Sequence, residues 1–275
     1  MRILCCVNRD LVSSVALNQL LPALGGHQVR VAVTERIGGS WSDADEPPAR
    51  RELRLAEQGL ANEVLFPLVE RADFPDDGAR YLTFGELERR RGIPVAPLPH
   101  PNSPEGLATV RAFAPDLILT IRYGAILKAA LIALPALGVL NLHAGILPAY
   151  RGVLATFRAL LRGDTEIGCT LHYIADGTID TGAVVGQTRL DVRPERSLLW
   201  HVLALYPAGT ALVAGAVARL AADGTLAATP QRTPGAAYYS YPAAEEWAEF
   251  ARRGWRVADV GDVDEALRRY LPLRT

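Results

Sequence analysis

The sequence predicts an α/β fold: a mainly parallel β-sheet with helices on both of its faces, followed by a short C-terminal extension. Short apolar runs typical of buried strands alternate with segments of helical periodicity over most of the chain, and this alternation favours a parallel sheet. The composition supports a large core, because 49% of the 275 residues are hydrophobic and 21% are charged. A chain of this length forms one large domain, or one domain and a small appendage.

The expected strands are short apolar runs bounded by Gly, Pro or polar residues. In chain order they are Arg2–Val7, Gln28–Thr34, Asp116–Ile121, Gly138–His143, Gly168–Ile174 and Ala183–Leu190. The last two flank a polar turn, Asp176–Gly182. Together these strands predict a Rossmann-like sheet, in which ligands bind beyond the carboxyl ends of the strands.

Helices are expected where apolar residues recur every three or four positions. Gly25 and Gly163 follow two of them, and Pro104 begins a third. The expected helices are Leu11–Leu24, Leu53–Leu60, Pro104–Ala114, Ala125–Leu134, Leu154–Leu161, Ser197–Ala222 (bent near Pro207), Ala244–Arg252 and Val263–Tyr270. Two further segments are expected to be irregular, the polar loop Gly38–Arg50 and the proline-rich Val95–Pro104.

The composition changes after about Gln231, so we expect a main domain over residues 1–232 and a mostly helical extension over residues 233–275. The extension contains Tyr238, Tyr239 and Tyr241. These rings either pin the extension to the core, the favoured alternative, or form a stacking surface for a ring-shaped substrate. The extension is also expected to shape one side of the functional site or to form the contact of a homodimer.

Charge and cysteine content exclude several classes of protein. The net charge is −1, without the basic excess that is typical of dedicated nucleic-acid binders. Three cysteines do not make a disulfide scaffold, and no Cys/His cluster has the spacing of metal ligands. No apolar run reaches the roughly 18 residues of a membrane span, and the N-terminus lacks a signal-peptide pattern. We therefore expect a cytoplasmic protein with no metal and with neither a membrane nor a nucleic acid as its partner.

One strand end carries residues suited to acyl-transfer chemistry. Asn141 and His143 lie two residues apart near the end of the strand Gly138–His143, so their side chains share one face. The turn Asp176–Gly182 offers a carboxylate. An amide can donate to a developing oxyanion, an imidazole exchanges protons near neutral pH, and a carboxylate orients the imidazole. A structural histidine and an aspartate that only shapes its turn are the alternatives. No glycine-rich fingerprint follows the first strand, which disfavours a nicotinamide enzyme.

Longer motifs around these residues resemble the folate-dependent formyltransferases. The segment Asn141–Gly152 (NLHAGILPAYRG) resembles their central motif, and Gly168–His172 (GCTLH) with Asp176–Gly182 resembles the motif that follows it. Upstream, Arg122–Leu127 is similar to the segment whose backbone cups the pterin, and His100–Ser103 is similar to another active-site loop. The resemblance extends over about residues 1–232 and is strongest from 95 to 190.

The resemblance implies a role for each matching position. Asn141 stabilises the tetrahedral intermediate, His143 is the general acid/base, and Asp180 tunes the protonation of His143. The formyl donor is 10-formyltetrahydrofolate, and no metal is needed. The residues implied in donor binding are Gly124, Ala125, Ile126 and Leu127, the turn residues Asp176, Gly177, Thr178 and Ile179, and the bordering loop Gly145, Ile146, Leu147 and Pro148.

Other residues near the motifs have less specific expectations. Asn102, Tyr150 and Arg151 are candidates for substrate contact, although for Arg151 the favoured alternative is that it anchors its own turn. His172 is expected to be a packing histidine, and the three cysteines are expected to fill small core positions.

The expected acceptor is a primary amine or hydroxylamine of a small molecule. The segment Asn8–Ser14 lacks the glycine-rich phosphate turn expected of a glycinamide ribonucleotide formyltransferase. The extension is too short for the basic tRNA-binding domain expected of a methionyl-tRNA formyltransferase, and no regulatory domain of the hydrolase type precedes the first strand. A methionyl-tRNA formyltransferase-like enzyme, a 10-formyltetrahydrofolate hydrolase and a non-catalytic folate-binding protein remain the alternatives.

Overall fold

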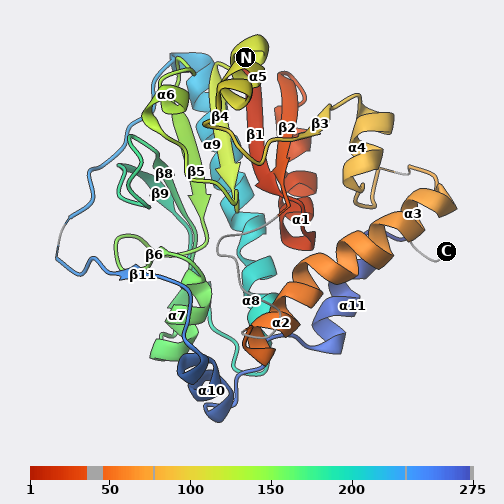
Figure 1. Ribbon diagram of the computed structural model, residues 1–275, viewed down its shortest axis with the longest axis vertical. Coiled ribbons are helices and arrows are strands. Elements are labelled where there is room, and N and C mark those ends of the chain that lie inside the picture. Colours follow the sequence, from red (N-terminus) through yellow and green to blue (C-terminus); the bar gives the residue numbers. More distant parts are fainter. Residues whose placement is uncertain (36–45, 77, 233, 273–275) are drawn as a thin grey trace.

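A seven-stranded sheet forms the centre of the molecule (Figure 1). The computed structural model describes the chain except for residues 36–45, 77, 233 and 273–275. The strand order is β3-β2-β1-β4-β5-β8-β9. The first five strands in this order pair in parallel. β8 pairs antiparallel with β5 on one side and with β9 on the other. Their bounds are β1 Arg2–Asn8, β2 Gln28–Thr34, β3 Val95–Pro97, β4 Leu117–Ile121, β5 Val139–His143, β8 Thr170–Tyr173 and β9 Val184–Gln187. The predicted Rossmann-like, mainly parallel sheet is therefore confirmed.

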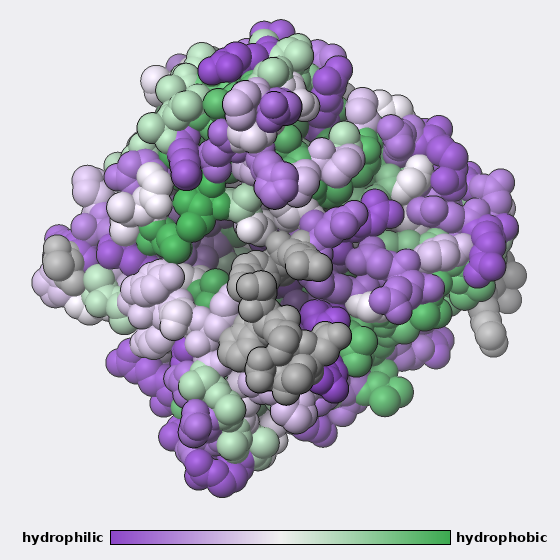
Figure 2. All heavy atoms as spheres, viewed as in Figure 1, coloured by the Kyte–Doolittle hydropathy of each residue, from purple (hydrophilic) through white to green (hydrophobic). Residues whose placement is uncertain are grey.

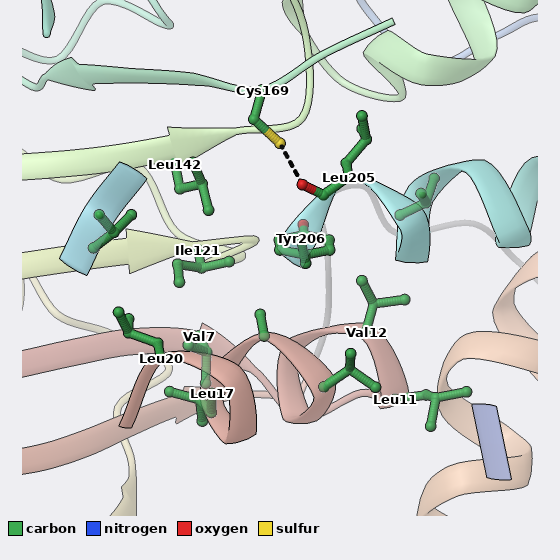
Figure 3. Packing of buried hydrophobic residues seen from close by; sticks show 14 of the residues in the cluster. Val7, Leu11, Val12, Leu17, Leu20, Ile121, Leu142, Cys169, Leu205 and Tyr206 are labelled. Atoms are coloured by element: carbon green, nitrogen blue, oxygen red, sulfur yellow. Dashed lines mark hydrogen bonds between the residues drawn. The ribbon is translucent and has the colours of Figure 1, made fainter. Parts of the chain in front are cut away.

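Helices cover both faces of this sheet. On one face, α1 (Leu11–Leu20) and α9 (Tyr206–Asp223) pack on the side chains of Val7, Ile121 and Leu142 (Figure 3). On the other face, α5 (Pro104–Phe113) and α6 (Ala129–Ile132) cover alternate residues of the same strands. The adjacent Cys5 and Cys6 belong to opposite faces, as strand geometry requires. All three cysteines are free and buried.

The segment that follows β2 differs most from the sequence prediction. Instead of a loop reaching Arg50 and a short helix Leu53–Leu60, one continuous helical stretch runs through α2 (Pro48–Arg54), a π-helical segment (Leu55–Leu65) and α3 (Phe66–Ala72). The π turns change the phase of the helix, so its buried residues do not follow the spacing by which a regular helix is recognised. Most of the predicted loop, residues 38–45, lies outside the described residues.

Three further predictions need correction. Only Ala129–Ile132 of the predicted helix Ala125–Leu134 is helical, because side-chain bonds from Asn102 hold residues 126–128 in another conformation. The predicted helix Ser197–Ala222 is divided at Leu205 into α8 (Leu198–Ala204) and α9. The stretch 198–223 is long and apolar enough to cross a membrane by length and composition, but half of its most apolar window is buried inside the protein. Val95–Pro97, predicted irregular, forms the edge strand β3.

The C-terminal extension packs beyond the carboxyl ends of the strands (Figure 1). Its short strand β11 (Tyr238–Tyr239) pairs in parallel with β6 (Arg151–Gly152). Its helices α10 (Ala244–Arg252) and α11 (Val260–Arg268) contact α7 (Ala155–Arg162) and α8 respectively. The ring centroids of Phe157 and Trp247 lie 4.3 Å apart in this contact. The remaining described elements are the 3-10 helix Leu21–Leu24, which continues α1, and α4 Phe84–Arg91, β7 Glu166–Ile167 and β10 Leu190–Asp191.

Candidate active site

A cavity of about 440 Å³ opens at the carboxyl ends of β4 and β5. Its walls come from residues 120–127, 141–144, 152–157 and 172–180, from α2 and the π-helical segment, from α8 and from Tyr241. In Figure 2, an apolar patch lies beside the hollow near the middle of the face. The position agrees with the rule that α/β sheets bind ligands where the strands end.

The cavity contains the three residues predicted to be catalytic. Asn141 and His143 extend from one face of β5, and Asp180 lies in the loop between β8 and β9. Asp180 Oδ2 is 3.5 Å from His143 Nδ1, and Asp180 Oδ1 is 3.4 Å from Asn141 Nδ2. Each carboxylate oxygen therefore faces one of the other two residues.

The carboxylate of Asp180 is held in its ionised form. Burial acts to raise its pKa, but the charge of His143, the hydrogen bond with His172 and the Gly152 N–H together outweigh burial. The Gly152 N–H donates to Oδ2 at 2.8 Å. These partners hold the pKa of Asp180 at about 2, so the group is a carboxylate at every pH at which the protein would work.

The imidazole of His143 lies between two acceptors. Its Nε2 is 2.6 Å from the carbonyl oxygen of Tyr150. A carbonyl only accepts, so Nε2 is the donor and carries a hydrogen. Nδ1, which faces Asp180, is therefore the nitrogen that gains or loses a proton. When both ring nitrogens carry a hydrogen, the ring can donate to the Tyr150 carbonyl and to the Asp180 carboxylate.

The amide of Asn141 is oriented by neighbours on two strands. The hydroxyl of Thr120 on β4 donates to Asn141 Oδ1 at 2.8 Å. The amide nitrogen consequently points towards β8 and the loop, where it lies 3.0 Å from His172 Nε2. Its contact with Asp180 is longer than an ordinary N–H···O bond. One amide hydrogen is thus available to an oxygen that enters the site.

His172 is both buried and part of this polar group. It is 1% exposed, and its Nδ1 donates to the carbonyl of Tyr173 at 2.9 Å. Its Nε2 faces Asn141 and lies 3.4 Å from Asp180 Oδ1. The prediction of a packing histidine missed these contacts, because they depend on the register that places His172 opposite Asn141. Register between distant strands leaves no local pattern in the sequence.

Most of the residues predicted to hold the donor line the cavity. They are Gly124, Ala125, Ile126 and Leu127 on one side and Asp176, Thr178 and Ile179 on the other, with Gly177 between them in the turn. Asn102 braces the first group: its Nδ2 donates to the Ile126 carbonyl at 2.7 Å, and its Oδ1 accepts from the Lys128 N–H at 2.8 Å. The side chain of Asn102 is therefore occupied within the protein.

The other predicted contact residues do not line the cavity. Tyr150 is 4% exposed and its hydroxyl donates to Asp164, while Arg151 donates to Gln231 Oε1 at 2.8 Å. The loop Gly145, Ile146, Leu147 and Pro148 lies behind the site. Gly145 supports His143 from there, because a Cβ on Gly145 would overlap the imidazole.

Charged side chains line the part of the cavity next to α2. Arg122, at the end of β4, pairs with Asp10 at 3.2 Å and with Glu57 at 2.7 Å. Burial raises the pKa of Glu57 to about 6 although Arg122 opposes the shift. Arg50 and Arg54 also face the cavity, and the guanidinium of Arg50 lies 5.1 Å from the ring centre of Tyr241. No motif in the sequence indicated Glu57 as a wall residue. Tyr241 is one of the tyrosines for which the sequence left a stacking surface as the less favoured alternative.

Comparisons with known proteins agree with this geometry. Residues 99–199 match the family described as formyl transferase. The chain is 39% identical over 150 residues to the methionyl-tRNA formyltransferase of Mycolicibacterium gilvum, covering 54% of this chain and 48% of that protein. It is 36% identical over 155 residues to the same enzyme of Burkholderia multivorans, covering 54% and 47%. The chain thus spans about half the length of these curated relatives.

Solved structures share the fold over most of the chain. An N-formyltransferase from Helicobacter canadensis, solved with folinic acid and dTDP-3-aminofucose, is 16% identical with a TM-score of 0.56, covering 95% of this chain and 85% of that chain. Glycinamide ribonucleotide transformylase 1 from Symbiobacterium toebii is 18% identical with a TM-score of 0.57, covering 84% and 94%. Asn141, His143 and Asp180 all fall within the segment that matches the family. Residues 99–199 therefore match the formyl transferase family, and the whole chain has the fold of solved formyltransferases.

Proposed function

We propose that this protein transfers a formyl group from 10-formyltetrahydrofolate to a primary amine or hydroxylamine of a small-molecule acceptor. The observation that carries the proposal is the convergence of Asn141, His143 and an ionised Asp180 in one cavity. An amide donor, an imidazole and a carboxylate at these distances are the groups that acyl transfer to an amine requires.

The donor fits the side of the cavity formed by residues 124–127 and 174–179. The backbone of 124–127 offers hydrogen-bonding groups to the edge of a heterocycle, and Leu127 and Ile174 offer apolar surface to its faces. The volume lies within the roughly 300–1,000 Å³ usual for small-molecule sites. The solved complex of the Helicobacter canadensis enzyme with folinic acid supports the same class of donor.

The reaction forms one C–N bond and one N–H bond and breaks one of each. The acceptor nitrogen attacks the formyl carbon, the bond from that carbon to N10 of the donor breaks, and a hydrogen of the amine ends on N10. Asn141 Nδ2 donates to the oxygen that becomes negative, a contribution of about 10²–10³-fold. His143 accepts the amine proton at Nδ1 and returns it to the leaving nitrogen, a contribution of roughly 10²–10⁴-fold. Asp180 stabilises the imidazolium that exists between the two transfers.

The acceptor fits the charged side of the cavity. Arg50, Arg54, Glu57 and Arg122 present both signs of charge there, and Tyr241 adds an aromatic ring. This surface suits a polar small molecule, and dTDP-3-aminofucose in the Helicobacter canadensis complex is an acceptor of that kind. Methionyl-tRNA is the second candidate acceptor, because the curated sequence relatives act on it by name. The net charge of −1 offers little of the attraction on which tRNA binding depends.

An acceptor screen tests the proposal. The purified protein is incubated with 10-formyltetrahydrofolate and, separately, with dTDP-linked amino sugars, hydroxylamine-bearing metabolites and methionyl-tRNA, and mass spectrometry detects the gain of one formyl group. A His143→Ala variant is the matched control. Release of tetrahydrofolate without an acceptor would instead identify a hydrolase, and folate binding in a thermal-shift titration without either reaction would identify a binding protein.

A further inference from the structure

One side chain outside the predicted site uses all of its polar groups to connect two parts of that site. Gln231 Nε2 donates to the carbonyl of Asp180 and to the carbonyl of Gly182, both at 2.8 Å. Its Oε1 accepts from Arg151 Nε at 3.1 Å and from Arg151 Nη2 at 2.8 Å. Gln231 therefore ties the loop that carries Asp180 to the strand β6.

The loop needs such support at Asp180. The backbone of Asp180 is in the left-handed region, with φ of 54°, which a non-glycine residue rarely adopts. Two residues later, Gly182 lies so close to the carbonyl of Tyr173 that no Cβ could fit. The two carbonyls that accept from Gln231 belong to these two constrained positions. Hydrogen bonds at both positions favour the one loop conformation that directs the carboxylate at His143.

The strand β6 forms the other side of the connection. Its Gly152 N–H donates to Asp180 Oδ2 at 2.8 Å, so β6 contacts the carboxylate directly. On its outer edge, β6 is held by the extension: the Arg151 N–H donates to the Ala237 carbonyl and the Val153 N–H donates to the Tyr239 carbonyl, both at 3.0 Å. The ring of Tyr239 also stacks on Tyr150, with 5.9 Å between centroids.

We propose that Gln231 is a positioning residue, which together with β11 holds Asp180 in place against His143. Gln231 does not line the cavity, and of the three proposed catalytic residues it bonds only Asp180. The consequence for turnover rests on the proposed function, but the coupling between Gln231 and the imidazole can be measured without it. The groups that face the imidazole are Asp180, His172 and the Tyr150 carbonyl, and Gln231 contacts only the first of them.

The first experiment measures this coupling by NMR. The ¹⁵N resonances of the His143 ring are followed across pH in the wild type, Gln231→Met, Gln231→Glu and Asp180→Asn. Met keeps the volume without hydrogen bonds, and Glu keeps the Arg151 partner but cannot donate to the two carbonyls. We expect both Gln231 variants to change the His143 titration in the same direction as Asp180→Asn. The exposed Gln28→Met on β2 is the control and should leave it unchanged. A wild-type titration in both Gln231 variants would overturn the proposal.

The second experiment measures turnover in a double-mutant cycle. With the acceptor that the screen identifies, we expect Gln231→Met to lower kcat by up to about 10²-fold, the cost of a misplacement of about 1 Å. The KM values for the donor and the acceptor should change little. In the Asp180→Asn background the same substitution should cost nothing further, because its effect passes through the carboxylate. Equal losses in both backgrounds would assign Gln231 a general structural role instead. If the wild type transfers no formyl group, the proposed function fails while the NMR result still decides the positioning role.

Discussion

Replacing Asp180 by Asn removes one charge from the site and keeps the size of the side chain. The His143 and Asp180 atoms that face each other are 3.5 Å apart, and both side chains are about nine-tenths buried. At that separation, a unit charge pair interacts by about 1.2 kcal/mol with the dielectric of water and about 4.7 kcal/mol with an effective dielectric of 20. The partly buried site lies between these limits. We expect kcat to fall by about 10²–10³-fold if the imidazolium forms in the rate-limiting step.

The pH dependence of the two proteins separates the roles of Asp180. Since the pKa of Asp180 is about 2, its own ionisation does not contribute to a pH–rate profile measured between 5 and 9. The carboxylate that favours a protonated ring is absent from Asp180→Asn, so the pH–rate profile of that variant should differ from the wild-type profile. Formyl transfer is assayed with one acceptor over this range. An Asn variant with wild-type rate and profile would refute the reasoning, because Asn is itself a good turn former.

The same substitution has a separate effect on stability. The folded-state pKa of Asp180 lies below its ordinary value of 3.8, so its contribution to stability is fully present above pH 4 and is lost as the pH falls through 2. A shift to about 2 corresponds to about 2 kcal/mol. Urea unfolding at pH 7 and pH 2.5 should show a smaller acid loss in Asp180→Asn than in the wild type. Equal losses in the two proteins would mean that the carboxylate is not stabilised by its partners in the fold.

Three further predictions concern other residues. His143→Ala should reduce kcat by at least roughly 10²-fold, the usual contribution of general acid–base catalysis. The folate affinity, measured by calorimetry, should be nearly unchanged. A variant that keeps more than about a tenth of the rate would exclude His143 as the proton carrier. Glu57 has a folded-state pKa of about 6, above its ordinary value of 4.5, so its contribution to stability decreases as the pH rises from 4.5 to 6. Glu57→Gln should remove that part of the pH dependence of stability, measured by thermal melts at low salt. Trp247→Ala should lower the free energy of unfolding by about 3–5 kcal/mol in chemical denaturation, because the ring is 3% exposed and packs on Phe157; a loss well below 1 kcal/mol would show that the extension contributes little to the stability of the core.

Elements with local boundaries could be predicted from the sequence almost residue by residue. The strand Gln28–Thr34 and the helix Ala244–Arg252 have in the structure the bounds that the sequence predicts. Within the stretch from Pro48 to Ala72 the sequence predicts only the short helix Leu53–Leu60, because π turns move the apolar residues out of the regular helical spacing. Local patterns are thus sufficient where a regular element ends at a clear turn or cap, and insufficient where the backbone geometry itself is unusual.

Local sequence patterns are also insufficient for those residues of the candidate site that come from distant segments. Asn141 and His143 are recognisable because they are two residues apart on one strand. His172, Glu57 and Gln231 reach the site or its support through strand register and through contacts between segments up to 65 residues apart. Only the folded chain brings these residues together, so no spacing in the sequence could indicate them.

The support of β6 by residues 231–239 has a consequence for how the protein is made. A nascent chain that has left the ribosome as far as α9 contains every strand of the main sheet and all three proposed catalytic residues. It still lacks Gln231, the Ala237 and Tyr239 carbonyls and the ring that covers Tyr150. Because synthesis proceeds from the N-terminus, the strands of the sheet leave the ribosome before the residues that complete the active site. Competence for catalysis would therefore appear only after residues 231–239 have also left the ribosome.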